Sequence, residues 1–243
     1  MYDLTGNRAY NADCMELMRE VPDKYFDLCV CDPPYGGGGS DDAEETFNVA
    51  ICGRFGGRFQ KDFKGEKMAD DIRNCRGRFS KYKDNEIRHW DFRPPQEYFS
   101  ELERVSKNRI IFGGNYFNLP PTRCFIIWRK TNIPTVGFTM APVEYAWTSF
   151  NKNASIYEGT SARTENSGRF HPTEKPIDLY TWILTNYAKK GDKILDTHLG
   201  SGSSRIAAYE LGLDFIGCEI DSEYFSKEEE RFAAYTAQTS LFH

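Results

Sequence analysis

Long hydrophobic runs are absent from this sequence of 243 residues. It contains no stretch of about eighteen apolar residues, the length that a membrane-spanning helix needs. The first residues lack the basic-then-apolar pattern of a secretory signal. The composition typical of disorder is also missing, because 40% of the residues are hydrophobic and 15% are aromatic. We therefore expect a cytoplasmic protein that does not contact a membrane and that folds as one domain over residues 1–243.

Paired cysteines are missing as well. The seven cysteines are scattered and include no Cys-x-x-Cys pair. Several lie inside apolar runs, where a thiol behaves as a small hydrophobic group. Cys29 and Cys31 alternate along an expected strand, a spacing that does not suit the ligands of one metal ion. We expect neither disulfides nor a metal site.

Charge is distributed unevenly, although the net charge is only −5. Residues 54–83 carry ten Lys or Arg against four Asp or Glu, whereas residues 214–231 carry seven acidic against two basic residues. This asymmetry suits a protein with one basic face for a polyanion and an acidic face elsewhere. Ordinary surface charge explains the same distribution equally well.

Short apolar strands alternate with amphipathic helices, which indicates an α/β fold whose mostly parallel sheet has helices on both faces. Seven strands are expected, at Asn7–Asp13, Asp27–Cys31, Arg109–Gly113, Cys124–Lys130, Val143–Phe150, Lys193–Asp196 and Asp214–Ile220. Helices are expected at Cys14–Val21, Gln96–Lys107 and Pro176–Lys189, from the turn after Asp196 to Leu211, and after a cap at Ser222. Since no helix separates the fourth and fifth strands, they should form an antiparallel hairpin at one edge.

A glycine-rich turn follows the strand that ends at Asp196. Gly200 and Gly202 let the backbone approach a ligand, and free N–H groups at the start of the next helix favour an anionic group. The following strand ends in Glu219, where an acid is placed to bind ribose hydroxyls. This series fits NAD, FAD or S-adenosylmethionine. A tight turn without a ligand is the alternative.

The tetrapeptide Asp32-Pro33-Pro34-Tyr35 follows another buried strand. The two prolines remove N–H donors and hold the backbone extended, so the Pro33 carbonyl is expected to accept a hydrogen bond. Asp32 adds carboxylate oxygens, and Tyr35 adds a flat ring. Together these groups can hold an amino group from two sides while stacking on the ring that carries it. A plain Pro-Pro turn with a surface Asp and Tyr is the alternative.

These motifs resemble the amino-methyltransferases of DNA, the N6-adenine and N4-cytosine group. The resemblance rests on the Asp-Pro-Pro-Tyr tetrapeptide, the loop from Asp196 to Ser204, and the segment His171-Pro172-Thr173-Glu174-Lys175-Pro176. The catalytic tetrapeptide precedes the cofactor loop, which is the order of the permuted β group. The resemblance covers nearly the whole chain except residues 36–90. One departure is Asp196-Thr197-His198, where the family more usually has Asp-Pro-Phe.

The resemblance implies a Rossmann-like class I methyltransferase with S-adenosylmethionine as cofactor, S-adenosylhomocysteine as product and no metal. Catalysis is assigned to Asp32, Pro33, Pro34 and Tyr35. Cofactor contacts are assigned to Asp13, Cys14, Asp32, His171, Thr173, Lys175, Asp196, Gly200, Gly202, Ser203 and Glu219. Within this set, Asp13 and Cys14 should line the cofactor's adenine, Glu219 its ribose, and Thr173 and Lys175 its carboxylate. A turn histidine with no role in binding is the alternative for His171.

The expected reaction is methylation of the N6 amino group of adenine in double-stranded DNA, with the base flipped out of the helix. N4-cytosine methylation needs the same chemistry, but a serine is more usual there at the position of Asp32, which favours adenine. A catalytically silent subunit that binds S-adenosylmethionine or DNA is a further alternative. A nicotinamide oxidoreductase would share the glycine-rich turn, but this function does not explain the Asp-Pro-Pro-Tyr tetrapeptide. A homodimer and a cognate restriction nuclease are candidate partners.

Two irregular segments are candidates for DNA contact. In residues 36–95, Arg and Lys alternate with aromatic residues, so basic groups can bind phosphates while rings stack on bases. A structureless segment of that length inside a compact domain is usually functional or disordered. A small subdomain with a phenylalanine core is the alternative. Residues 151–169 form a polar loop that is a second, shorter candidate for target recognition.

Overall fold

A computed structural model of the chain describes residues 1–35, 93–134, 141–161, 170–171 and 173–239. The chain divides into two units. The first comprises residues 1–33, 95–135 and 141–243, and the second comprises residues 34–94 and 136–140. Residues 36–92 of the expected insertion lie outside the described residues. All helices and strands that the structure describes belong to the first unit.

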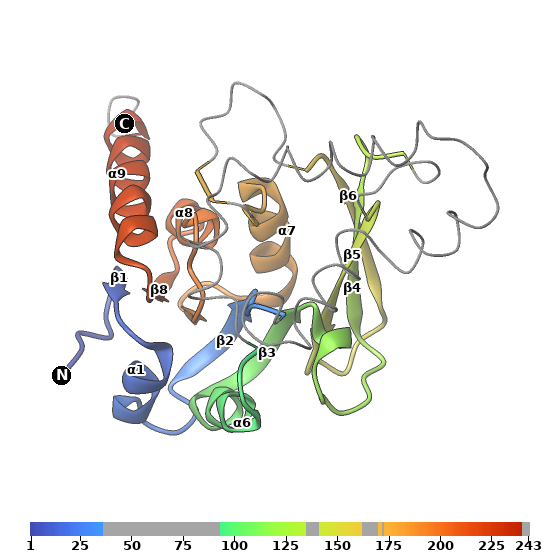
Figure 1. The fold of residues 1–243 in the computed structure, drawn as a ribbon, viewed down its shortest axis with the longest axis horizontal. Coiled ribbons are helices and arrows are strands. Elements are labelled where there is room, and N and C mark those ends of the chain that lie inside the picture. Colours follow the sequence, from blue (N-terminus) through green and yellow to red (C-terminus); the bar gives the residue numbers. More distant parts are fainter. Residues whose placement is uncertain (36–92, 135–140, 162–169, 172, 240–243) are drawn as a thin grey trace, which may run out of the picture. The chain divides into compact units, whose positions relative to one another are not determined.

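The described residues form one eight-stranded sheet in the order β1-β8-β7-β2-β3-β5-β4-β6 (Figure 1). The strands are β1 (Asn7–Asn11), β2 (Phe26–Cys31), β3 (Ser106–Phe112), β4 (Phe125–Lys130), β5 (Val143–Thr148), β6 (Ser155–Gly159), β7 (Lys193–Asp196) and β8 (Asp214–Glu219). The five strands from β1 to β3 in this order are parallel, whereas β5 runs antiparallel to β3 and β4. The expected mostly parallel sheet is confirmed.

Helices cover both faces of this sheet (Figure 1). The helices α1 (Cys14–Glu20) and α6 (Gln96–Val105) lie on one face, and α7 (Ile177–Tyr187) and α8 (Ser203–Glu210) lie on the other. Successive side chains of β2 point to opposite faces. Leu28 and Val30 accordingly join the core under α7 and α8, while Cys29 and Cys31 join the core under α1 and α6. The last helix, α9 (Ser222–Thr239), packs near α8, β1 and β8.

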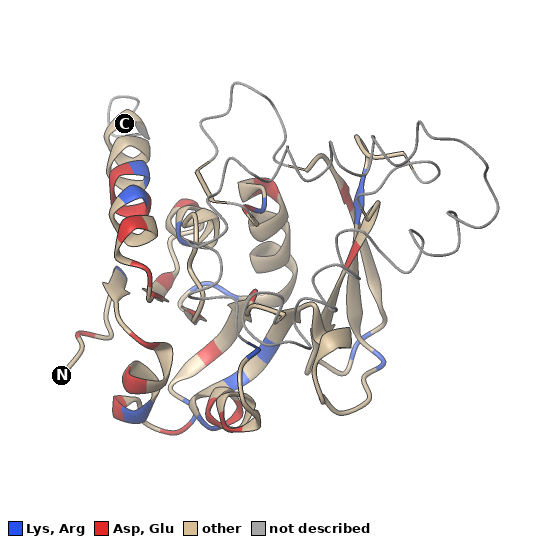
Figure 2. Ribbon diagram, in the orientation of Figure 1, with Lys and Arg blue, Asp and Glu red and all other residues tan. Residues whose placement is uncertain are grey.

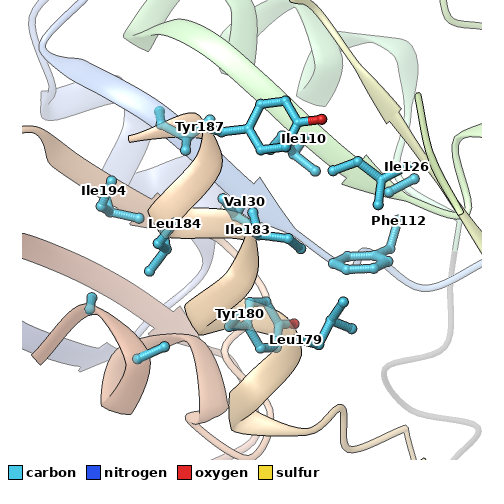
Figure 3. Close-up of a cluster of buried hydrophobic side chains, with 14 of the residues drawn as sticks. Val30, Ile110, Phe112, Ile126, Leu179, Tyr180, Ile183, Leu184, Tyr187 and Ile194 are labelled. Atoms are coloured by element: carbon cyan, nitrogen blue, oxygen red, sulfur yellow. The ribbon is translucent and has the colours of Figure 1, made fainter. Parts of the chain in front are cut away.

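The core under α7 fixes the segment that leads into this helix. Figure 3 shows side chains of α7 packed against side chains of the sheet. At the start of the helix, the Tyr180 ring meets the Phe112 ring edge to face, with 6.0 Å between the centroids. Leu179 and Ile183 are fully buried in the same cluster. Since Phe112 ends β3, this packing holds the residues before α7 close to the carboxyl end of the sheet.

Two strand predictions were wrong. The eighth strand, β6, lies within residues 151–169, which the sequence indicated as polar loop, and it pairs in parallel with β4. Its outward side chain Ile156 is 65% exposed, and its inward side is formed by Ser155, Tyr157 and Gly159. This reversal of the usual apolar-inside pattern hid the strand. The expected hairpin of β4 and β5 exists, but β6 covers β4, so the hairpin does not form the edge.

Helix boundaries differ from the expectations by small amounts. The predicted cap of the last helix, Ser222, is the first helical residue, and the preceding Asp221 is the cap. Its carboxylate accepts hydrogen bonds from the N–H groups of Glu223 at 2.9 Å and Tyr224 at 3.0 Å. Helix α6 ends at Val105 rather than at Lys107, because β3 begins at once. Among the described helices, none is long and apolar enough to cross a membrane.

Candidate active site

The carboxyl ends of four adjacent strands bring acidic residues to one edge of the sheet. Asp13 follows β1, Glu219 ends β8, Asp196 ends β7 and Asp32 follows β2. The strands β2 and β7 are neighbours in the sheet. After β2 the chain continues to β3 on one side, whereas after β7 it continues to β8 on the opposite side, so the chain direction diverges between β2 and β7. Ligands of open α/β sheets bind at such a divergence, outside the carboxyl ends of the strands. The structure therefore offers a ligand site along this edge.

The glycine-rich loop is tied to the end of β8 through Glu219. Gly200 and Gly202 have φ angles of +54° and +75°, in the left-handed region that favours glycine. The N–H of Gly200 donates to one carboxylate oxygen of Glu219 at 2.9 Å, and the N–H of Asp221 donates to the other at 3.0 Å. Burial raises the pKa of Glu219, although these N–H groups act in the opposite direction. Glu219 thus holds the loop at the place where ribose recognition was expected.

His171 and Thr173 lie against the same loop. A Cβ atom on Gly200 would lie 3.2 Å from the His171 ring, so a side chain there would crowd the imidazole. The Thr173 hydroxyl lies 3.2 Å from His171 Nδ1, and the imidazole meets the Tyr224 ring edge to face at 4.5 Å. The structure therefore brings the His171 segment and the glycine-rich loop together.

Helix α9 supports the loop from behind. Figure 2 shows acidic and basic positions along this helix. Glu228 is buried and forms an ion pair with Arg205 at 2.9 Å. A Cβ atom on Gly202 would lie only 2.4 Å from Glu228 Oε1. Arg231 donates to the Ser201 carbonyl at 2.6 Å and to the Ser203 hydroxyl at 3.1 Å. Gly202 and Ser203, which were predicted to contact the cofactor, therefore lie at the start of α8 and against α9.

Asp196 is buried at the centre of the edge. Its carboxylate accepts hydrogen bonds from the Ser204 hydroxyl at 2.5 Å and from the His198 N–H at 3.0 Å. Burial nevertheless raises the pKa of Asp196 to about 7, and the negative charges of Asp32 and Glu219 act in the same direction. Asp196 ends β7, and β7 lies between β8 and β2, so Asp196 lies between the strand end that carries Glu219 and the one that leads to Asp32.

The raised pKa of Asp196 predicts a pH-dependent stability. The unfolded chain ionises this group near its ordinary value of 3.8, whereas the folded protein keeps it protonated up to about 7. Between these values the folded state binds more protons, so the free energy of unfolding falls as the pH rises. We expect Asp196→Asn to remove roughly 3 kcal/mol of this fall. Urea unfolding of the ligand-free protein from pH 4 to 7 measures it, with the exposed Glu230→Gln as control. An equally steep fall in Asp196→Asn would contradict the assignment.

The departure at Thr197 and His198 is accommodated by a tyrosine of α6. The Tyr98 hydroxyl lies 2.6 Å from the Thr197 hydroxyl, and its ring meets the His198 ring edge to face at 5.4 Å. Burial lowers the pKa of His198 to about 4, against the effect of Asp13, so the imidazole is neutral at pH 7. A neutral aromatic ring thus occupies the place where the family more usually has phenylalanine.

Asp13 and Cys14 connect β1 to α1. The Asp13 carboxylate caps this helix by accepting a hydrogen bond from the Met15 N–H at 2.8 Å. Burial, together with the charge of Asp13 and the neighbouring Cys31, raises the pKa of Cys14 to about 12, so the thiol stays protonated. Because β1 pairs with β8 up to Asn11 and Glu219, Asp13 and Cys14 lie at the sheet edge, next to the end of β8.

A second group of charges surrounds Asp32. Lys175 forms an ion pair with the Asp32 carboxylate and lies 3.5 Å from Glu144, which pairs with Lys130 at 2.5 Å. We call these four residues the lysine–carboxylate cluster.

The rest of the tetrapeptide lies at the boundary between the two units. Pro33 ends the first unit, while Pro34 and Tyr35 belong to the second. The described residues contain no group of three or more His, Cys, Asp or Glu suited to a metal ion.

Glu144 and Lys130 were not predicted from the sequence as site residues. Each is a charged residue within an otherwise largely apolar strand, in Val143–Thr148 and Phe125–Lys130 respectively. A charge at the end of such a strand, on the edge that carries the predicted site, was the available signal. It could be used only once the antiparallel direction of β5 was known, because that direction places the start of this strand beside the end of β4.

A family model for DNA methylases of the N6 and N4 type matches residues 90–230. The type II methyltransferase M1.MboII of Moraxella bovis is 26% identical over 61% of this chain, and the match covers 49% of that protein. The chain thus spans about half the length of this relative. YubD of Escherichia coli (strain K12) is 22% identical over 94% of this chain and 91% of its own length.

Two solved structures share the fold. The complex of M1.HpyAVI with SAM covers 92% of this chain and 98% of its own, with a TM-score of 0.53 and 19% identity. The cytosine-N4-specific PvuII DNA methyltransferase covers 95% of this chain and 88% of its own, with a TM-score of 0.57 and 12% identity. The expected Rossmann-like class I architecture is therefore confirmed.

Proposed function

Because this chain belongs to the DNA methylase family of N6 and N4 amino-methyltransferases, we propose that it transfers a methyl group from S-adenosylmethionine to the N6 amino group of adenine in DNA. The observation that carries this proposal is the position of Asp32. It begins Asp-Pro-Pro-Tyr directly after β2, next to the strand that ends in Asp196 and opens the glycine-rich loop. Cofactor and target amino group would then meet at one point of the sheet edge.

The residues of the edge fit S-adenosylmethionine in charge and shape. Its sulfonium group is a cation, and the edge carries the carboxyl groups of Asp13, Glu219 and Asp32. Gly200 offers backbone without a side chain, next to the carboxylate that suits ribose hydroxyls. When bound, the cofactor supplies an electrophilic methyl group. We assign the contacts to ten of the eleven residues predicted from the sequence, that is, to all of them except Lys175.

The protein's own groups would position the target amino group. Tyr35 stacks on the flipped base, while Asp32 and the Pro33 carbonyl accept hydrogen bonds from the two N–H bonds. These bonds orient the nitrogen lone pair towards the methyl group and stabilise the positive charge that develops on nitrogen. Pro34 keeps the tetrapeptide extended. The methylated nitrogen then loses one of its protons to solvent, and S-adenosylhomocysteine leaves as the second product. Oriented acceptors are sufficient for this step, so no covalent link to the enzyme is proposed.

The choice of adenine rests on Asp32. Cytosine-N4 enzymes more usually have serine at this position, while the fold does not discriminate, since the PvuII enzyme is cytosine-N4-specific. N4-cytosine methylation therefore stays the alternative reaction. A silent subunit would bind S-adenosylmethionine without transferring the methyl group.

Target recognition is proposed for segments outside the core of the sheet. Residues 36–95, with their basic and aromatic side chains, are proposed to bind DNA phosphates and bases. The second candidate, residues 151–169, contains β6, so its recognition part is limited to residues outside Ser155–Gly159. The homodimer and the cognate restriction nuclease stay predictions.

Nucleoside mass spectrometry of DNA from cells that express the protein tests the proposal. We expect N6-methyladenine in DNA from cells with the intact protein and none with Asp32→Ala. N4-methylcytosine in its place would keep the mechanism and overturn the base assignment. Neither base, from a protein that binds S-adenosylmethionine, would support the silent subunit.

A further inference from the structure

The lysine–carboxylate cluster is an alternating row of charges. The Lys175 ammonium lies between the carboxylates of Asp32 and Glu144, and Glu144 in turn lies between Lys175 and Lys130. The two lysine side chains are only 5% and 8% exposed, and the carboxylate side chains 13% and 29%. The Lys175 nitrogen also lies 4.7 Å above the centre of the Phe112 ring. Each buried charge therefore has a partner of opposite sign.

The topology of the sheet brings these residues together. Asp32, Phe112 and Lys130 stand at the carboxyl ends of β2, β3 and β4. Glu144 stands near the start of β5, which is antiparallel, so its start lies at the same edge. Lys175 comes from the segment that α7 holds against Phe112. Four neighbouring strands thus contribute to one cluster on the side of Asp32 that faces away from the glycine-rich loop.

The charges within the cluster favour the ionised forms of Lys175 and Glu144. Burial alone would lower the pKa of Lys175, but Asp32 and Glu144 outweigh it and raise this pKa. Burial alone would raise the pKa of Glu144, but Lys175 and Lys130 outweigh it and lower this pKa. Burial raises the pKa of Asp196 and of Tyr180, and the negative charge of Asp32 acts in the same direction on both. Among these groups, Lys175 is the cation that contacts the Asp32 carboxylate.

We propose that Lys175 and Glu144 are positioning residues for Asp32: Lys175 holds the catalytic carboxylate in a fixed orientation through their ion pair, and Glu144 holds Lys175 in place. This inference rests on the proposed function. It replaces the expectation that Lys175 binds the cofactor's carboxylate, because its ammonium is buried between two carboxylates of the protein. A carboxylate has several acceptor sites, so Asp32 can bind Lys175 and a target amino group together.

Two substitutions should shift the pH dependence of methyl transfer in opposite directions. In Lys175→Met, Asp32 and Glu144 face each other without the cation, so one of them takes up a proton at higher pH. We expect the acid limb of kcat to rise by about one pH unit or more, with kcat about 10²-fold lower. In Glu144→Gln, Lys175 keeps Asp32 as its anionic partner, while the negative charge of Glu144 beside them is removed. The acid limb of kcat should therefore move to lower pH.

Three further measurements separate positioning from other roles. The dissociation constant for S-adenosylmethionine, measured by calorimetry, should change less than about threefold in both variants. Lys175→Arg keeps the charge and should retain the wild-type acid limb. The matched control is Arg129→Met, which breaks the exposed pair between Arg129 and Glu158 on the neighbouring strands. Should Lys175→Met fail to fold, Glu144→Gln still tests the inference, because glutamine keeps the shape and an acceptor oxygen.

The outcomes distinguish this inference from the proposed function. Opposite shifts of the acid limb, with cofactor affinity unchanged, support the positioning role. Loss of cofactor binding in Lys175→Met, with kcat retained at saturating cofactor, would return Lys175 to the cofactor site and overturn the inference. So would an equal loss of kcat at every pH in both variants. If wild-type protein transfers no methyl group at all, the proposed function itself fails.

Discussion

Replacing Asp32 by asparagine is expected to lower kcat for methyl transfer about 10³-fold. Asparagine keeps the shape of the side chain but loses the negative charge that stabilises the developing positive charge on the amino nitrogen. Its amide also removes one of the two carboxylates that pair with the buried Lys175 ammonium, which leaves Glu144 at 3.5 Å. Cofactor affinity should change less than about tenfold, since Glu219 and the glycine-rich loop are untouched.

The matched control for this prediction is Asp27→Asn. Asp27 lies on β2, the strand that Asp32 follows, but near its amino end, where it pairs with Lys107 at 2.6 Å. Steady-state transfer of a labelled methyl group to unmethylated DNA measures both variants, and calorimetry measures their cofactor binding. An Asp32→Asn enzyme with kcat close to that of Asp27→Asn would contradict the role given to Asp32.

Replacing Gly202 by alanine is expected to destabilise the protein by about 4 kcal/mol or more. Gly202 has a φ of +75°, and the new Cβ would lie 2.4 Å from Glu228 Oε1. Because Glu228 is fully buried and paired with Arg205, relief of the overlap must disturb a buried ion pair. Such a disturbance costs about 3–5 kcal/mol, in addition to about 1–2 kcal/mol for the left-handed backbone.

Gly212→Ala separates these two contributions. Gly212 has a similar φ of +63°, but a Cβ there would meet nothing within 4 Å. Its expected cost is therefore only the backbone part, about 1–2 kcal/mol. Urea unfolding of both variants, with cofactor binding as a second readout, measures the difference. Equal stabilities would mean that α9 does not hold the glycine-rich loop as the structure indicates.

The sequence was most informative where apolar runs end at special residues. The strands that lead to Asp32 and Asp196 were predicted because buried parallel strands are short and apolar, and because proline or glycine stops them. The β6 strand was missed because its inner side is formed by Ser155, Tyr157 and Gly159, while Ile156 faces solvent. The parallel pairing with β4, which the sequence alone does not show, makes this segment a strand.

The candidate site was predictable in its motifs and not in its contacts. The positions of Asp13, Glu219, Asp196 and Asp32 at one edge follow from the parallel direction of their strands. The pairing of Lys175 with Asp32 depends on where α7 packs, and the part of Glu144 depends on the antiparallel β5. Both are tertiary contacts between residues far apart in the chain, so no local sequence pattern predicts them.

The central claim is that this chain moves a methyl group from S-adenosylmethionine to the amino nitrogen of adenine. The most direct measurement incubates the purified protein with unmethylated DNA and S-adenosylmethionine that carries a trideuterated methyl group, followed by mass spectrometry of the nucleosides. The account predicts deuterated N6-methyladenine with the wild-type protein and a trace with Asp32→Asn. Absence of deuterium from every nucleoside, in protein shown to be folded and to bind the cofactor, would contradict it.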